Sequence, residues 1–205
     1  MTVTRKGLRE MLGAPRYLRE PPEKEPRVGV VNGLAYTSVG GELLEVECST
    51  MNGKGTLKLT GQLGDVMKES AEAAFSWVRA HSEELGLQKD FYQGIDIHIH
   101  VPEGAVPKDG PSAGVTMTTA LVSALTGKPV RQEVAMTGEV TLRGRVLPIG
   151  GLKEKTLAAY RAGMRTLVIP EENRKDLEKI PEHVLAQFRI VEVKDVKEVL
   201  KTALI

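Results

Sequence analysis

Cysteine is nearly absent from this sequence: Cys48 is the one cysteine in 205 residues. One thiol excludes a disulfide framework, and the residues after Met1 lack the apolar stretch of a secretory signal. Apolar runs are short as well, since the longest, residues 113–125, falls well below the roughly 20 residues that span a bilayer. The sequence therefore predicts a cytoplasmic protein that has no membrane partner.

An excess of charge of either sign is also missing. Lysine and arginine number 28 against 27 aspartates and glutamates, which gives a net charge of +1. Binding to a phosphate backbone normally needs a cationic excess, so we expect no nucleic-acid partner. What the chain does have is 41% hydrophobic residues, enough for the core of one domain.

Proline and charge set the first residues apart from the rest. Residues 1–12 fit a short helix, and residues 13–26 hold four prolines, which predicts an extended linker. We therefore expect an arm over residues 1–26 and a globular domain over residues 27–205.

Hydrophobic periodicity predicts a mixed α/β domain, β-rich at first and then alternating β and α. The β-rich part is expected to be antiparallel, with Asn32-Gly33 as a turn between two strands and Cys48 as a small buried residue. Strands are predicted over 28–31, 34–39, 42–50, 57–59, 95–101, 134–137, 140–147, 166–169 and 188–193. Helices are predicted over 65–85, 113–125, 152–162 and 196–204, with Gly86, Gly127 and Gly163 as C-terminal caps and Asp195 as an N-cap.

The loop over residues 104–114 carries the clearest chemical signal. Ser112 falls where the next helix is predicted to begin, the place where free N–H groups and the positive end of the helix dipole converge. Three uses are open: an N-cap, a phosphate site, or a nucleophile whose oxyanion is held by amides near Asp109, Gly110 and Ser112.

A nucleophilic serine needs a base, and histidine is the first candidate. His98 and His100 share one face of a predicted strand, but neither has an evident carboxylate partner for a triad. A metal site would need a third ligand that the spacing does not provide, so a solvated sheet face is favoured. His81 and His183 lie in polar helical contexts.

Lysine is the other candidate base, provided that burial lowers its pKa by several units. Helical spacing places Lys155 among short apolar side chains at positions 152, 158, 159 and 162. Lys153 instead neighbours Leu157 and Tyr160. The pattern favours Lys155, and a solvated surface lysine remains the alternative.

Three blocks, residues 107–114, 136–144 and 147–155, resemble the signature blocks of the Lon protease peptidase domain, in the same order and spacing. The resemblance extends from about Arg27 to the C-terminus. It implies the Lon peptidase fold and an ATP-dependent serine endopeptidase with a Ser-Lys dyad. It also implies a homohexameric ring that degrades unfolded or damaged polypeptides in protein quality control.

Carried over by position, the resemblance makes Ser112 the nucleophile and Lys155 the general base. Thr137 matches a residue whose hydroxyl helps to orient the lysine. Asp109 and Gly110 belong to a loop thought to switch between blocked and open forms.

The resemblance also identifies residues 33–38 as the edge that lines the substrate cleft. Ala35 and Tyr36 are the implied substrate-binding residues. Many members of the family carry tryptophan where this chain has Tyr36.

The nucleotide-binding pattern Gly-x-x-x-x-Gly-Lys-[Ser/Thr] does not occur in this sequence. Gly127-Lys128 lacks the upstream glycine and is followed by proline. The resemblance then implies that residues 1–26 end an ATPase module absent from this chain. We expect no cofactor for the peptidase domain itself, and ATP with Mg²⁺ only through that module.

Two other functions use the same features. A small-molecule kinase fold has a Pro-x-x-x-Gly loop and serines that open a helix, which residues 107–112 partly match. A non-catalytic scaffold that keeps the fold is the third reading.

Overall fold

The computed structural model describes residues 4, 7, 11–13, 25–37, 40–102 and 107–205. Most of the predicted arm therefore lies outside the described residues, as do the end of the strand expected over 34–39 and residues 104–106. The boundary between residues 26 and 27 stays a prediction.

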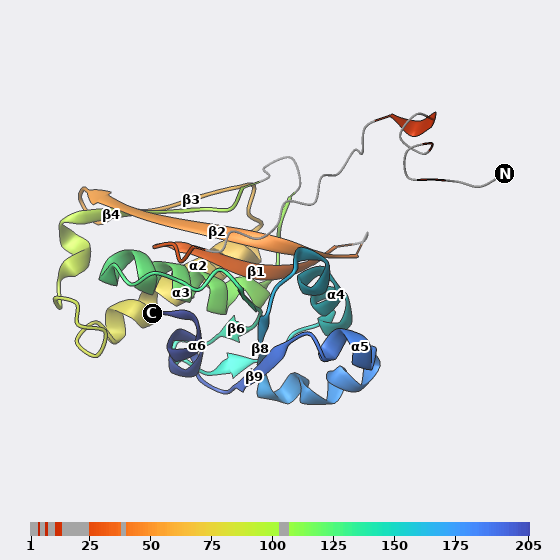
Figure 1. The fold of residues 1–205 in the computed structure, drawn as a ribbon. Helices are drawn as coiled ribbons and strands as arrows, with labels where there is room; N and C mark the ends of the chain where they lie inside the picture. Colours follow the sequence, from red (N-terminus) through yellow and green to blue (C-terminus); the bar gives the residue numbers. More distant parts are fainter. Residues whose placement is uncertain (1–3, 5–6, 8–10, 14–24, 38–39, 103–106) are drawn as a thin grey trace.

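The described chain alternates strands and helices, which confirms the mixed α/β class (Figure 1). The strands are β1 (Val30–Thr37), β2 (Gly40–Asn52), β3 (Leu57–Thr60), β4 (Ile95–His100), β5 (Val134–Met136), β6 (Glu139–Val140), β7 (Val146–Leu147), β8 (Thr166–Pro170) and β9 (Arg189–Val193). The α-helices are α2 (Asp65–Ala80), α3 (Gly114–Thr126), α4 (Leu152–Ala162), α5 (Glu182–Leu185) and α6 (Val196–Ala203). The 3₁₀ helices are η1 (Phe91–Gln93), η2 (Pro111–Ala113) and η3 (Glu171–Lys179).

Seven strands form one sheet in the order β3-β4-β2-β1-β5-β8-β9. β2 pairs antiparallel with β1 and β4, as expected for the β-rich part. β3 is the exception, because it runs parallel to β4. β1, β5, β8 and β9 are also mutually parallel, so their carboxyl ends share one edge of the sheet.

Helices cover both faces of the central strands. One core packs α2, α3 and α6 against side chains such as Val31, Val46 and Ile99, and Figure 1 shows α2 and α3 beneath the long strands. The other core packs α4 and α5 against Leu34 and Leu167. Adjacent strand residues thus point into different cores, as a period of two requires.

The predicted turn at Asn32-Gly33 is wrong, because both residues lie inside β1. The Asn32 side chain is buried and its Nδ2 donates to the Gln132 carbonyl at 3.0 Å. A Cβ on Gly33 would lie 2.7 Å from Thr116 Oγ1 of α3, so the glycine allows close strand-to-helix packing. The dipeptide that favours hairpin turns serves here for packing.

Other element ends differ from the prediction. α2 ends at Ala80 with His81 as its C-cap, so the helix expected to reach residue 85 is shorter. Residues 140–147 form the short pair β6 and β7 in place of one strand. The elements η3 and α5 were not predicted. The ends of α4 and the capping roles of Gly127, Gly163 and Asp195 are confirmed.

In the part of the chain that the structure describes, no helix combines the length and apolar character needed to cross a bilayer.

Candidate active site

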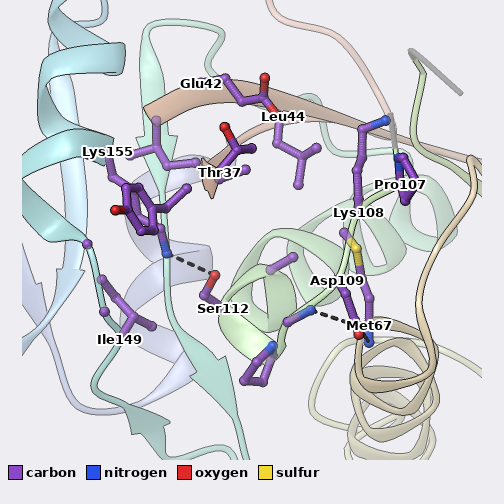
Figure 2. A pocket seen from close by; sticks show the side chains of 18 of the residues that line it. Thr37, Glu42, Leu44, Met67, Pro107, Lys108, Asp109, Ser112, Ile149 and Lys155 are labelled. Carbon is purple, nitrogen blue, oxygen red and sulfur yellow. Dashed lines mark hydrogen bonds between the residues drawn. The ribbon is translucent and has the colours of Figure 1, made fainter. Parts of the chain in front are cut away.

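A cleft of about 390 Å³ opens where the parallel strands β1 and β5 end. Ligands of α/β proteins commonly bind at this edge of the sheet. Asp109, Ser112 and Lys155 line this cleft, as Figure 2 shows, although Lys155 lies far from the other two in the sequence. Tyr36 lines it too. The apolar part of its wall includes Leu44, Met67 and Ile149.

Ser112 lies in η2, immediately before α3. Of the three uses left open for Ser112, the N-cap is wrong, because α3 begins at Gly114 with Ala113 as its N-cap and has no side-chain cap. The Ser112 hydroxyl instead accepts a hydrogen bond from Lys155 Nζ at 2.9 Å. Its backbone N–H lies in the first turn of η2, where no acceptor exists within the helix.

Lys155 reaches Ser112 from the opposite layer, on the buried side of α4. Only 2% of its surface is exposed, and Leu152, Ala158 and Ala159 beside it are buried too, as the helical spacing predicted. Burial lowers the pKa of the Lys155 amine from its usual 10.5 to about 8, since the low-dielectric surroundings disfavour the charged form. Lys153 is exposed.

Thr137 follows β5 and completes a three-residue arrangement. Its hydroxyl accepts from Lys155 Nζ at 3.1 Å and donates to the Ser112 carbonyl at 3.3 Å. The Gly138 N–H donates to the same carbonyl at 2.9 Å. The residues that follow β5 therefore hold the Ser112 backbone and also provide a hydrogen-bond acceptor for the lysine amine.

Asp109 does not contact Lys155. Figure 2 shows it on the far side of Ser112, beside Met67. Its Oδ1 accepts from the Met67 N–H at 3.0 Å and from the Gly110 N–H at 2.8 Å. The Gly110 amide, one of the expected oxyanion donors, is thus engaged by a carboxylate.

Ala35 and Tyr36 lie in the part of β1 that extends past β5. The β1–β5 pairing covers only Asn32 and Gly33, whereas the β1–β2 ladder continues to Thr37. Residues 34–37 therefore face the cleft along the edge that β5 leaves uncovered. Tyr36 is 57% exposed there.

The remaining candidates lie outside this cleft. His98 Nε2 and His100 Nδ1 each lie within 2.8 Å of Thr60 Oγ1 on one face of the sheet, and the described residues include no cluster of three metal-ligating groups. Cys48 is buried, as predicted, and burial raises the pKa of its thiol to about 12. It is therefore unsuited to nucleophilic chemistry.

A comparison with models of protein families identifies the family of this chain. The model of the Lon protease (S16) C-terminal proteolytic domain matches residues 2–205. The chain belongs to this family. The resemblance of the three sequence blocks and the expected Lon peptidase fold are thereby confirmed.

Relatives of the family are close in sequence. The chain is 60% identical to Lon protease 1 of Bacillus subtilis over 205 residues, all of this chain and 26% of that protein. It is 60% identical to the Lon protease of Geobacter metallireducens over 202 residues, 98% of this chain and 24% of that protein. The Lon protease of Vibrio parahaemolyticus is 58% identical over 204 residues and is 26% covered. The chain thus spans about a quarter of the length of the curated relatives it matches.

The start of α2 at Asp65 agrees with the prediction, but sequence reasoning missed that this helix start contacts the loop before Ser112. The Met67 N–H donates to the Asp109 carboxylate, and a Cβ on Gly64 would meet the Asp109 side chain. The signal in the sequence was Gly64, a glycine immediately before the predicted helix, where a Cβ would meet Asp109.

Proposed function

We propose that this chain is a serine endopeptidase in which Ser112 is the nucleophile and Lys155 the general base. The observation that carries the proposal is the 2.9 Å approach of a buried amine, whose pKa lies near 8, to one serine hydroxyl. At about pH 7 roughly a tenth of the molecules then carry the neutral amine, which is the form that accepts a proton.

The reaction has two steps. Neutral Lys155 Nζ takes the Ser112 hydroxyl proton as Oγ attacks the scissile carbonyl, and the Ser112 N–H donates to the oxyanion that forms. The lysine ammonium then gives its proton to the leaving amine, which leaves an acyl group on Oγ. Water, deprotonated by Lys155, attacks this ester and returns Ser112 to its starting state. Thr137 keeps the amine directed at Ser112 throughout.

The substrate is an extended segment of unfolded polypeptide. Residues 34–37 of β1 lack a neighbouring strand on the cleft side, so a peptide added there pairs its main chain with β1. Ala35 and Tyr36 then contact its side chains. A folded substrate cannot present such a strand, so an unfolded one is required.

Assembly and energy coupling belong to the same proposal. The chain acts within a homohexameric ring, and ATP with Mg²⁺ binds to an ATPase module outside this sequence. Sedimentation of this chain tests the ring, and a monomer at all concentrations would contradict assembly through this domain alone.

A phosphate-binding role at the same loop has less support. A phosphate bound before Ser112 would use the Gly110 amide, and this amide already donates to the Asp109 carboxylate at 2.8 Å.

Covalent capture by a peptide boronate tests the dyad. We expect stoichiometric modification at Ser112 in the native chain, and at least a thousandfold slower hydrolysis of unfolded casein for Ser112→Ala and Lys155→Ala. Modification at another residue, or full activity in either variant, would overturn the proposal.

A further inference from the structure

The loop that carries the nucleophile is attached to residues 62–67, which lead into α2, by hydrogen bonds that none of the three catalytic groups makes. The Lys108 N–H donates to the Gln62 carbonyl at 3.1 Å, and the Gly64 N–H donates to the Lys108 carbonyl at 2.7 Å. The Asp109 carboxylate adds the bond from the Met67 N–H at 3.0 Å. Lys108 and Asp109, shortly before Ser112 in the sequence, thus make three hydrogen bonds to residues 62–67.

α2 also lacks a cap of its own. Its N-cap residue is Gly64, which has no side chain to accept from the first turn. Asp109, from a distant part of the sequence, supplies that acceptor and places a negative charge at the positive end of the helix.

Gly64 leaves room for this contact. A Cβ built on Gly64 would lie 2.3 Å from Asp109 Cγ and 2.6 Å from Asp109 Oδ2, closer than real atoms approach. Any side chain at position 64 would therefore displace the carboxylate. Its φ of −69° requires no glycine, so the close approach is the reason that glycine fits here.

Resting on the proposed function, we infer that the start of α2 is the seat of the nucleophile loop, and that Gly64 and Asp109 are positioning residues for Ser112. The seat holds one end of the segment 107–112, while Thr137 and Gly138 hold the Ser112 carbonyl at the other end. Between them Gly110 adopts φ 122°, a conformation that favours glycine. Releasing the seat lets Ser112 move away from Lys155 without altering either side chain.

Three variants and one control test this inference by the rate of acylation from a fluorogenic peptide. Asp109→Ala and Gly64→Ala should each lower kcat at least tenfold. Asp109→Asn keeps an acceptor at the same position and should recover most of that loss. The midpoint of the pH profile should stay near 8 in all of them, because the seat acts on the position of Ser112 and not on the charge of Lys155. Gly94→Ala, where a Cβ meets nothing within 4 Å, should match the native chain.

Hydrogen exchange separates this inference from the proposed function. In Asp109→Ala and Gly64→Ala, the amides at positions 64 and 67 should exchange at least tenfold faster than in the native chain, whether or not the protein hydrolyses peptides. Fast exchange together with full activity would overturn the inference, as would native exchange in both variants. An Asp109→Asn variant that is as slow as Asp109→Ala, and whose pH profile has a shifted midpoint, would also overturn the inference. A native chain that lacks hydrolysis would count against the proposed function alone.

Discussion

At the scale of single residues, the proposed mechanism depends on the charge state of Lys155. Because burial lowers the pKa of this amine to about 8, the neutral form gains about tenfold per pH unit below that value and saturates above it. We therefore expect kcat/KM for a short peptide to rise with pH and level off near pH 8 to 9. A profile that keeps rising to pH 10 would show an ordinary exposed amine. Lys155→Arg should be inactive at every pH, since guanidinium does not lose its proton in this range.

Two threonines of α3 allow a matched test of buried hydroxyls. Thr116 Oγ1 is buried and has no hydrogen-bond partner among the described residues, whereas Thr118 Oγ1 donates to the Gly114 carbonyl at 2.8 Å. Valine removes an unsatisfied group in the first case and a bonded one in the second. We expect Thr116→Val to have a free energy of unfolding about 1 kcal/mol higher than Thr118→Val, measured by urea denaturation. Equal values, or the reverse order, would contradict this assignment of hydroxyl partners.

The sequence alone pointed to Ser112 and Lys155 but did not show that they are in contact. Helical periodicity favoured Lys155 over Lys153, and the structure places Lys155 on the buried side of α4 and Lys153 on the exposed side. The approach of Lys155 to Ser112 depends on two helices from opposite layers meeting at one sheet edge. The contact between Asp109 and Met67 joins segments 42 residues apart, which no local pattern reports.

At the scale of elements, close packing of α3 against β1 requires Gly33. An added methyl would lie 2.7 Å from Thr116 Oγ1 and 3.3 Å from the Leu44 carbonyl oxygen. Gly33→Ala should therefore lower the free energy of unfolding by about 1 to 3 kcal/mol. Combining it with Thr116→Ala should cost less than the sum of the single changes, because the second change vacates the space. Strict additivity in urea titrations would contradict this packing.

Element boundaries were predictable where a cap is local. Gly163 closes α4 and Asp195 opens α6, and both were found from sequence because the signals lie next to the helix. The Asn32-Gly33 turn failed because tertiary packing uses both residues inside a strand. The predicted end of α2 was wrong for a similar reason, because the apolar pattern continues to Leu85 although the helix ends at His81. The His81 Nδ1 lies 2.9 Å from the Trp77 carbonyl oxygen.

At the scale of the whole molecule, the burial of Lys155 makes stability depend on pH. Below about pH 8 the amine is protonated in both the folded and the unfolded chain, so the folded state bears the full cost of burying a charge. Between about 8 and 10.5 the unfolded chain binds the proton and the folded one does not, so stability rises with pH.

The comparison with Lys155→Met isolates this effect. The variant should be the more stable protein at about pH 7, and its advantage should shrink by roughly 2 kcal/mol between about pH 8 and pH 9.5. The difference between the two proteins cancels contributions from other groups, such as the Cys48 thiol, which stays protonated in the fold up to about 12. If the native chain and Lys155→Met differed in free energy of unfolding by the same amount at every pH, the result would contradict a buried amine.

The most direct measurement is the titration of the Lys155 amine itself. Lysine labelled with ¹³C at Cε gives a resonance whose shift follows protonation, and Lys155→Met assigns the signal by its loss. A midpoint near 8 is the predicted result. A midpoint near the usual 10.5 would mean that the amine stays charged at neutral pH, and Lys155 would then not act as the base for Ser112.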